Sequence, residues 1–530
     1  MRAFLSRLHS ILVTGAIVAG ASIVTTGAVA TTAMASPGGP DFGSNVLIFN
    51  PSMPQSQIQA AVDSVSNQQV NNEFGNQRFA LLFEPGTYGS KDSPLVFQVG
   101  YYTSVAGLGL SPNDVVINGA IVVFNRCSSS GTCNALTNFW RSLSNLTINL
   151  SLPAKAPAYA PPSNDTYGAG CDNSAEMWAV SQAAPVRRVA VNGFVTLADY
   201  CAPNHFSSGG FIADSTFAGS TVLDDTQQQF FVRNSQLDGW TNAVWNQVFS
   251  GDTGTVPAQS FPNPTYTTLA TNPVTREAPF LYLDASGKYS VFAPNVRRNS
   301  SGTSWGSGQE AGRSIPIDRF FIAKPGDSVN AINEALGRGK NLILTPGVYH
   351  LDGAIEVTRP DSIVLGLGFA TLTPADGNQA MTVETSKGVL LSGLLFDAGA
   401  ENSRVLLQVG NRQSRGNDSR GSGDGATTSD PSALTDVFFR IGGAAAGKAT
   451  TSLVVNSDNA ILDDVWAWRA DHGNGVGWTA NTADTGVVVN GDNVTAYGLF
   501  VEHYQKYEVI WNGNGGTDIF FQNEMPYDVP

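Results

Sequence analysis

Residues 452–470 read SLVVNSDNAILDDVWAWRA, and residues 486–502 read GVVVNGDNVTAYGLFVE. Each segment joins two short apolar runs across a turn of Asn, Asp and small residues. A similar polar turn opens residues 511–524, WNGNGGTDIFFQNE. Short strands between polar turns, recurring every roughly 20–30 residues, are typical of a solenoid in which each rung buries its apolar face against the next. These segments therefore predict a right-handed parallel β-helix.

A second repeat indicates that this architecture occurs twice. The first half contains Phe83-Glu84-Pro85-Gly86-Thr87-Tyr88, and the second half contains Leu344-Thr345-Pro346-Gly347-Val348-Tyr349. A helical stretch precedes each copy, at residues 58–65 and 329–336. Repeated order of distinct local signals predicts two copies of one fold. We therefore expect an all-β, pectate-lyase-like chain of two tandem right-handed parallel β-helix domains, each with a short N-terminal capping helix at its open end.

The expected boundaries follow from composition. Residues 1–35 have a basic start, an apolar stretch and the small-residue site Ala33-Met34-Ala35, which together predict a secretory signal cleaved before Ser36. We therefore expect a secreted, extracellular protein. A polar segment rich in Gly and Ser marks the linker between the domains. The expected segments are residues 42–295 for the first β-helix domain, 296–315 for the linker and 316–530 for the second β-helix domain.

Charge narrows the range of partners. The formal net charge is −14 at pH 7 and charged residues make up 14% of the chain. A chain this acidic is a poor candidate for binding nucleic acid or an anionic membrane surface. A neutral partner such as a sugar polymer is compatible with it. We expect a monomer that binds no nucleic acid and no membrane.

The chain contains four cysteines, all in its first half: Cys127, Cys133, Cys171 and Cys201. An even number in an exported chain suggests disulfides, and three pairings are possible. The short loop between Cys127 and Cys133 favours their pairing, with Cys171 bonded to Cys201. Free buried thiols are the alternative. The spacing of Cys and His matches no metal motif, so we expect no metal and no cofactor.

Two glutamates recur at the length of one rung. Glu502 and Glu524 each follow an aromatic-rich strand, and the interval between them matches the expected repeat. Residues one rung apart stack at the strand spacing of about 4.8 Å. Two carboxyl groups that close repel each other, so the pKa of one should rise, and a carboxylic acid that stays protonated can donate a proton to a leaving sugar oxygen. The alternative is that both are turn carboxylates, one of them paired with Lys506.

Polar side chains of the first half suggest a way to hold water. Gln228 and Ser250 are separated by the same sequence interval as the two glutamates, and Gln227 and Gln229 flank Gln228. Amide and hydroxyl groups are poor bases, but together they can fix the orientation of a water molecule. The alternative is a structural Asn/Gln ladder of the kind found inside solenoids.

Aromatic and histidine residues near these groups are candidate sugar contacts. Trp245 and Trp511 lie close in sequence to the polar candidates, although an aromatic residue in such a chain is more often part of the core. His503, beside Glu502, is a candidate hydrogen-bond partner for substrate. For His472 a structural role is the simpler interpretation.

Several motifs taken together resemble glycoside hydrolase family 55, the exo-acting β-1,3-glucanases or laminarinases. The resemblance covers about residues 42–530, in the same order in both domains. It rests on the two Pro-Gly-x-Tyr segments and on WAVSQAAPVRRVAVNG (178–193), QQQFFVRNS (227–235), VWNQVFSG (244–251), DVFFRIGG (436–443), FVEHYQKYEVIWNG (500–513) and QNEMPYD (522–528).

This resemblance implies a secreted enzyme that hydrolyses β-1,3-glucan from the non-reducing end with inversion and releases glucose. It implies that Glu524 is the general acid and that Glu502 lines the same pocket. Gln228 and Ser250 match best the residues that hold the attacking water. Which two of the three glutamines 227–229 face the pocket stays open.

Two further expectations complete the prediction. Relatives of this kind continue past the QNEMPYD segment, so we expect the second domain to lack its C-terminal rungs. A pectate-lyase-like enzyme or phage-type depolymerase would need a calcium-binding Asp cluster with a catalytic base, for which Asp463, Asp464 and Arg469 are the weak candidates. A non-catalytic glycan-binding protein is the third possibility.

Overall fold

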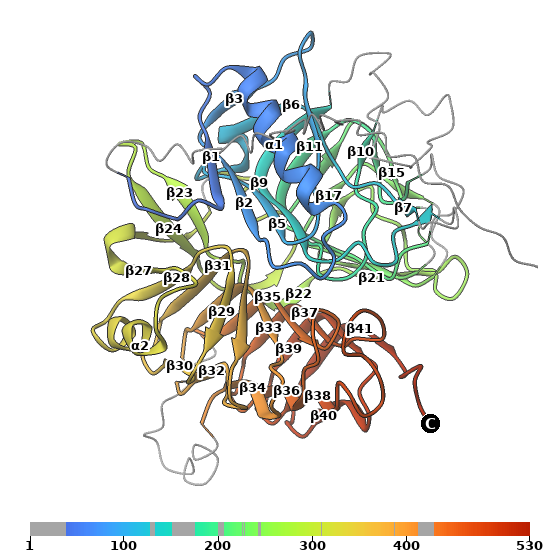
Figure 1. The fold of residues 1–530 in the computed structure, drawn as a ribbon. Coiled ribbons are helices and arrows are strands. Elements are labelled where there is room, and N and C mark those ends of the chain that lie inside the picture. Colours follow the sequence, from blue (N-terminus) through green and yellow to red (C-terminus); the bar gives the residue numbers. More distant parts are fainter. Residues whose placement is uncertain are drawn as a thin grey trace, which may run out of the picture. The chain divides into compact units, whose positions relative to one another are not determined.

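The computed structural model describes residues 39–530, except for residues 128–132, 151–174, 200–205, 225, 227, 242–244, 309, 386 and 412–428. These described residues form one compact unit. The described residues form two α-helices and many short strands, most of them paired in parallel (Figure 1). The structure therefore confirms the predicted all-β fold of two parallel β-helices.

A large sheet runs through the first β-helix, and each of its strands pairs in parallel with the strand of the next rung. Its main path is β1 (Val46–Phe49), β2 (Phe79–Phe83), β5 (Thr103–Gly107), β9 (Arg141–Leu150), β11 (Val186–Asn192), β13 (Phe211–Ala213), β16 (Phe230–Arg233), β19 (Gln247–Ser250) and β21 (Tyr266–Leu269). Beside this path lie β3 (Gly86–Tyr88), β4 (Leu95–Gln98), β6 (Val115–Val122), β14 (Thr216–Ala218), β17 (Gln236–Leu237) and β20 (Thr253–Gly254). A smaller parallel sheet consists of β10 (Glu176–Met177), β12 (Val195–Thr196), β15 (Val222–Leu223) and β18 (Trp240–Thr241).

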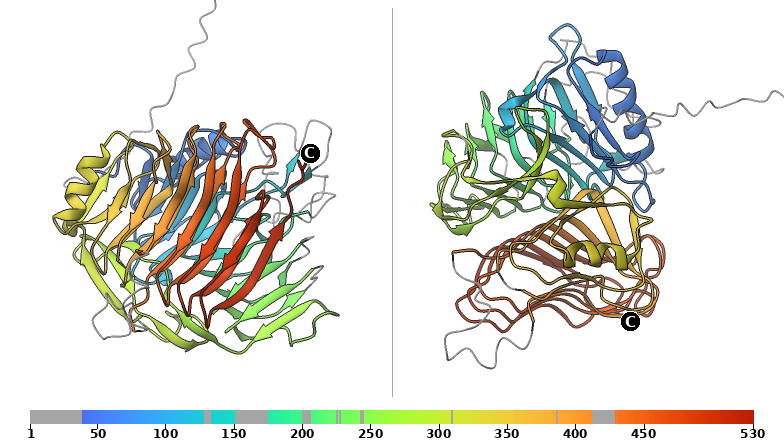
Figure 2. Two further views of the ribbon diagram at one scale, coloured as in Figure 1. Left: turned by 90° about the horizontal axis from the view of Figure 1, so that it is seen from below. Right: turned by 90° about the vertical axis from the view of Figure 1, so that its left-hand side faces the viewer.

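The second β-helix is built from two parallel sheets, whose strands stack in register (Figure 2). One contains β27 (Phe320–Ala323), β28 (Asn341–Leu344), β29 (Val348–Leu351), β31 (Ile363–Pro374), β33 (Leu390–Asp397), β35 (Ala433–Ile441), β37 (Ile461–Arg469), β39 (Thr495–Glu502) and β41 (Thr517–Glu524). The other contains β30 (Ile355–Val357), β32 (Met381–Val383), β34 (Ser403–Val409), β36 (Ala449–Val455), β38 (Ala483–Val489) and β40 (Tyr507–Trp511).

Antiparallel strands occupy the stretch between the two β-helices. They are β22 (Asn272–Thr275) with β25 (Arg297–Ser300), and β24 (Tyr289–Pro294) with both β23 (Phe280–Leu283) and β26 (Gly312–Pro316). The segment predicted as a linker, 296–315, thus contains β25 and most of β26. Short 3-10 turns lie at Pro112–Asp114 (η1) and Ile317–Arg319 (η2).

Each helix follows the first strand of one of the β-helices, close to the start of that domain, where the sequence predicts it. α1 (Gln55–Gln69) and α2 (Val329–Gly337) contain the two helical stretches expected from sequence. In α2 the Ser328 side chain accepts a hydrogen bond from the main-chain N–H of Ala331, which satisfies one free donor of the first turn. Apolar side chains of α2, among them Ile332 and Leu336, are buried in the core of the second β-helix. The helices therefore cover apolar surface that the first rung would otherwise expose.

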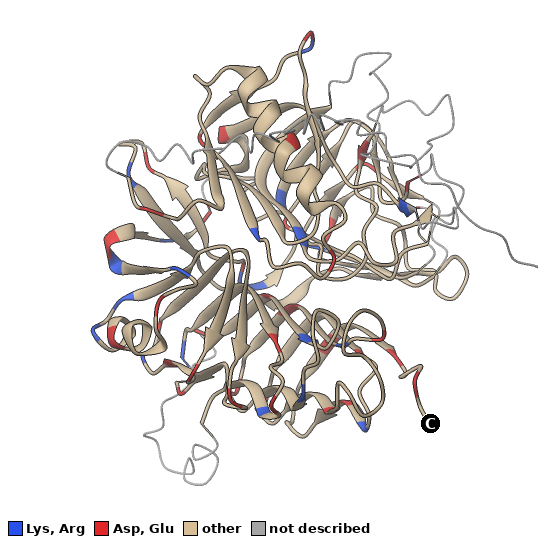
Figure 3. Cartoon of the chain, viewed as in Figure 1, with Lys and Arg blue, Asp and Glu red and all other residues tan. Residues whose placement is uncertain are grey.

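Buried charges connect the two β-helices. Arg233 of β16 binds both oxygens of Glu277, at 2.7 and 2.8 Å, and also pairs with Asp463 of β37. Arg187 of β11 pairs with Asp463 and with Asp436 of β35. Figure 3 shows charged positions in both halves along this seam. Because the arginines come from the first β-helix and Asp436 and Asp463 from the second, this network fixes the two halves against each other.

Two of the four cysteines, Cys127 and Cys133, lie within the described residues. Cys127 and Cys133 are register partners in the hairpin of β7 (Arg126–Cys127) and β8 (Cys133–Asn134). Cys171 and Cys201 lie outside the described residues, so the pairing of the four stays a prediction.

No helix in the described part of the chain is long and apolar enough to cross a membrane.

Candidate active site

Glu502 and Glu524 end two neighbouring strands. They are register partners at the carboxyl ends of β39 and β41, as their spacing in the sequence predicts. The Glu502 side chain is buried, with 3% of the residue exposed, whereas Glu524 is partly open to solvent. Lys506 pairs with Asp484 at 2.6 Å. The structure therefore brings the two glutamates together and assigns Lys506 to another partner.

Glu502 sits in an apolar, aromatic environment. Its Oε1 accepts a hydrogen bond from Gln182 Nε2 at 2.6 Å, and its Oε2 accepts one from Trp466 Nε1 at 2.9 Å. Burial raises the pKa of Glu502 well above its usual range, and the nearby charge of Glu524 raises it further. Glu502 therefore keeps its proton at a pH where an exposed glutamate is ionised.

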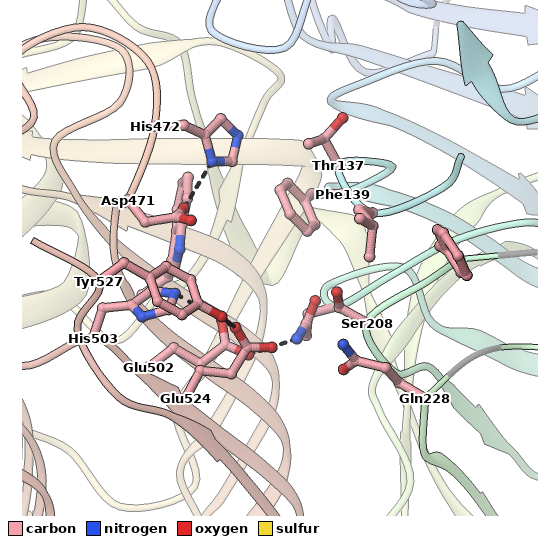
Figure 4. Close-up of a pocket in the computed structure, with 14 residues that line it drawn as sticks. Thr137, Phe139, Ser208, Gln228, Asp471, His472, Glu502, His503, Glu524 and Tyr527 are labelled. Atoms are coloured by element: carbon pink, nitrogen blue, oxygen red, sulfur yellow. Dashed lines mark hydrogen bonds and ion pairs between the residues drawn. The ribbon is translucent and has the colours of Figure 1, made fainter. Parts of the chain in front are cut away.

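Glu524 faces the cavity and has polar partners. Tyr527 donates its hydroxyl proton to Glu524 Oε2 at 2.5 Å. Gln522 Nε2 lies 3.4 Å from Oε1, and His503 Nε2 lies 3.9 Å from Oε2. Figure 4 shows Glu524, Glu502, Tyr527 and His503 on one side of the cavity. A carboxyl group that is held in place yet open to solvent can exchange a proton with a bound molecule.

Residues of both β-helices line a cavity of about 410 Å³. The wall opposite the glutamates comes from the first β-helix and carries Gln228 and Ser208 together with Phe139 and Thr137 (Figure 4). The full lining is Leu136, Thr137, Phe139, Gln182, Phe206, Ser208, Gln228, Trp468, Asp471, His472, Glu502, His503, Glu524 and Tyr527. The cavity therefore combines two carboxyl groups on one wall with amide and hydroxyl groups on the other.

A charged group lies at one side of the cavity. His472 contacts Asp471 Oδ1 through Nδ1 at 2.7 Å and Glu73 Oε1 through Nε2 at 2.8 Å. Burial alone would lower the pKa of His472, but its hydrogen bonds to Asp471 and Glu73 raise it to about 9. His472 is therefore a cation at neutral pH. Because Glu73 follows α1, this imidazolium also joins the two halves of the chain.

Ser250 does not line this cavity, contrary to the expectation that it helps Gln228 to hold water. It is fully buried, and its Oγ donates to Asn272 Oδ1 at 2.6 Å. The reason is rung length. In this part of the first β-helix Phe230 is the register partner of Gln247, so the rung is shorter than the interval from Gln228 to Ser250. Ser250 is therefore the register partner of Arg233 and does not stack on Gln228.

Of the other predicted contacts within the described residues, Trp245, Trp511 and Gln229 lie outside the cavity lining and His503 lies within it. Trp245 is 56% exposed and Trp511 packs against the core of the second β-helix. Gln229 is half-buried and is absent from the lining, whereas Gln227 lies outside the described residues. His503 does line the cavity, with Nδ1 at 3.0 Å from the main-chain oxygen of Met525.

Sequence reasoning missed several lining residues. Gln182 lies within the segment WAVSQAAPVRRVAVNG and Tyr527 within QNEMPYD, the segments that carry the family resemblance. Those motifs could therefore have identified Gln182 and Tyr527 as candidate site residues. Ser208 stands in a polar run that no pattern distinguishes, and only the folded chain brings it opposite Glu524.

Within the described ranges, no three His, Cys, Asp or Glu side chains converge in a way that could hold a metal ion. Asp463, a candidate for calcium binding, is instead buried in contact with Arg187 and Arg233. Arg469 pairs with Asp528.

Known proteins are similar to this chain over most of its length. Residues 320–524 match the model of the LAM55 pectate lyase-like domain. An exo-β-1,3-glucanase of Streptomyces sp. (strain SirexAA-E / ActE) is 49% identical over 495 residues, which cover 93% of this chain and 74% of that protein.

Two solved structures are also similar to this chain. sacteLam55A from Streptomyces sp. SirexAA-E superposes with a TM-score of 0.82 at 48% identity, covering 93% of this chain and 82% of that one. A variant of that protein in complex with glucose superposes with a TM-score of 0.81 at 47% identity, over 93% and 81% of the two chains.

Proposed function

Because the chain belongs to glycoside hydrolase family 55 and is a glycoside hydrolase, we propose that it cleaves β-1,3-glucan of the laminarin type from the non-reducing end, with inversion, releasing glucose. The relative that is 49% identical is an exo-β-1,3-glucanase, and a glucose complex exists for a variant of the similar solved structure. The observation that carries the proposal is the pair of stacked glutamates facing amide and hydroxyl groups across one cavity.

Glu524 is the proposed general acid. Glycoside hydrolysis requires a carboxylic acid that protonates the leaving oxygen. Glu524 is the more exposed of the two glutamates, and Glu502 keeps its own proton because it is buried. Because Glu502 stays neutral, no second negative charge lies beside Glu524.

Inversion follows from where the two kinds of group lie. Glu502 and Glu524 stand about 4.8 Å apart on adjacent strands, so both face the same side of a bound sugar. A water that attacks from the opposite side must be held by the other wall. Gln228 and Ser208 supply an amide and a hydroxyl group there, and Gln182, which also lines the cavity, donates to Glu502. These groups can orient a water that no carboxylate on that wall activates.

We also propose that the protein is a monomer and is secreted after cleavage before Ser36. Secretion is supported by the basic, apolar and small-residue pattern of residues 1–35. A polymeric substrate that cannot enter a cell agrees with a secreted enzyme.

A pectate-lyase-like reaction is the second candidate, and the geometry disfavours it. Its base would have to be a free arginine or lysine in a cleft, but Arg469 is bound on two sides by Asp528 and Asn481. Asp463 is likewise committed to the seam between the β-helices.

Glu524→Gln is the decisive variant. We expect turnover of laminarin to fall at least about a thousandfold, because the amide cannot donate a proton to the leaving oxygen. The matched control is Glu508→Gln: burial raises the pKa of Glu508 to about 8, yet this residue does not line the cavity. NMR of the wild-type reaction should show α-glucose as the first product.

Three results would contradict the proposed function. β-Glucose as the first product would refute inversion, and unsaturated uronides from pectin would favour the lyase. A fully active Glu524→Gln enzyme would remove Glu524 from the role of acid.

A further inference from the structure

A short irregular segment places a hydroxyl group on the proposed acid. Residues 525–528 follow β41 and lie outside any sheet, so no strand ladder holds them. Tyr527 is 70% exposed, yet its hydroxyl lies 2.5 Å from Glu524 Oε2. Its ring also packs against His503, with ring centroids 4.8 Å apart, so this contact and the position of the main chain together hold the hydroxyl there.

Arg469 holds residues 525–528 in place through Asp528. Its Nη1 donates to Asp528 Oδ1 at 2.8 Å and its Nη2 donates to Asp528 Oδ2 at 2.7 Å. A two-bond arginine–carboxylate contact sets direction as well as distance. The hydrogen bond of Arg469 also lowers the pKa of Asp528, so the pair stays charged at neutral and mildly acid pH.

Arg469 is itself held rigidly. It is the last residue of β37, and 1% of it is exposed. Its Nε donates to the main-chain oxygen of Asn481 at 2.8 Å, and its Nη1 lies 3.3 Å from the main-chain oxygen of His503. The Arg469 guanidinium therefore connects residues 525–528, which lie outside the sheets, to main-chain groups of the second β-helix.

We propose that Arg469 and Asp528 form a positioning pair that holds the Tyr527 hydroxyl on the acid Glu524. Neither residue of the pair lines the cavity, so they act through Tyr527. The inference rests on the proposed role of Glu524. A hydrogen bond to a carboxylate stabilises its charged form, so Tyr527 eases proton release from Glu524 as the leaving oxygen takes the proton.

The test uses Asp528→Asn, because Asp528 is partly exposed and its replacement removes one hydrogen bond and the charge without emptying the core. We expect kcat on laminarin to fall about 10- to 100-fold with a smaller change in KM. Asp484→Asn, which breaks the exposed pair with Lys506, is the matched control and should change neither quantity.

A double-mutant cycle separates positioning from general damage. Tyr527→Phe should reproduce the loss, and Asp528→Asn combined with Tyr527→Phe should be no worse than Tyr527→Phe alone. Independent, additive losses in the two single variants would overturn the proposal.

A readout without activity keeps this test distinct from that of the proposed function. The Glu524 hydrogen bond raises the pKa of the Tyr527 phenol above its ordinary value. In NMR of isotope-labelled tyrosine, Asp528→Asn should lower that pKa toward the ordinary value. An unchanged Tyr527 titration would refute the pair, whereas a protein that hydrolyses no glucan would refute only the proposed function.

Discussion

Glu502 holds a carboxyl group where water is largely excluded, which makes its protonation a property of the fold. Both its oxygens accept hydrogen bonds from neutral donors, Gln182 and Trp466. Donors alone would favour the anion, but burial outweighs them and raises the pKa. A neutral carboxyl can also donate to the Gln182 side chain if that amide turns its oxygen toward Glu502. The environment is therefore built for a neutral group.

Glu502→Gln should therefore change how stability depends on pH. Between the ordinary glutamate pKa near 4.3 and its raised value in the folded protein, folded Glu502 holds a proton that the unfolded chain has lost. The wild type should lose stability through this window as pH rises, by up to about 1.4 kcal/mol per pH unit, and the variant should not. Denaturation curves measured at pH 5, 6, 7 and 8 would check this. Parallel pH profiles of the two proteins would contradict a buried neutral Glu502.

At the scale of the rung, asparagines stack from turn to turn. Asn490 Nδ2 donates to Asn456 Oδ1, and Asn512 Nδ2 donates to Asn490 Oδ1, both at 2.9 Å. These residues follow β36, β38 and β40, so one ladder connects three successive turns. The amides replace main-chain bonds that a turn cannot make, which explains the recurring Asn in these turns.

Asn490→Ala removes the middle step of this ladder. We expect a loss of about 1–3 kcal/mol in the free energy of unfolding, because the amides of Asn456 and Asn512 each lose a partner and the buried Asn490 is removed. Asn149→Ala is the matched control: it interrupts a similar ladder with Asn118 and Asn192 in the first β-helix, which is more exposed. Its cost in chemical denaturation should be smaller, and equal costs would mean that burial does not decide the effect.

Rung length also explains how far the sequence predicted the site. In the second β-helix Thr495 is the register partner of Thr517, so the interval between Glu502 and Glu524 is one full rung and periodicity alone stacks them. In the first β-helix the rungs vary, and the same interval placed Ser250 wrongly beside Gln228. Ser208 could not be predicted at all, because its place opposite Glu524 depends on how the two β-helices pack.

At the scale of the whole molecule, the cavity depends on a seam of buried charge. Burial opposes ionisation of Glu277, but the charge of Arg233 overcomes it and lowers the pKa of Glu277 to about 2. Arg233 also pairs with Asp463 of the second β-helix. A carboxyl group with a lowered pKa stabilises the fold above its ordinary pKa near 4.3, and that contribution disappears as pH falls toward 2. The seam should therefore weaken in acid.

Arg233→Met tests what this seam contributes. Methionine fills much of the space but leaves Glu277 and Asp463 buried without this shared cation, so we expect a loss of about 3–5 kcal/mol. The pKa of Glu277 should rise, which shifts the acid-induced loss of stability to higher pH. Lys506→Met, the control, removes a cation from an exposed pair and should cost less than about 1 kcal/mol.

The same variant, Arg233→Met, also tests how the seam affects activity. Because the glutamates and Gln228 belong to different β-helices, laminarin hydrolysis by Arg233→Met should fall at temperatures where the protein is still largely folded. Activity that persists until global unfolding would mean that the two walls of the cavity stay aligned without the seam.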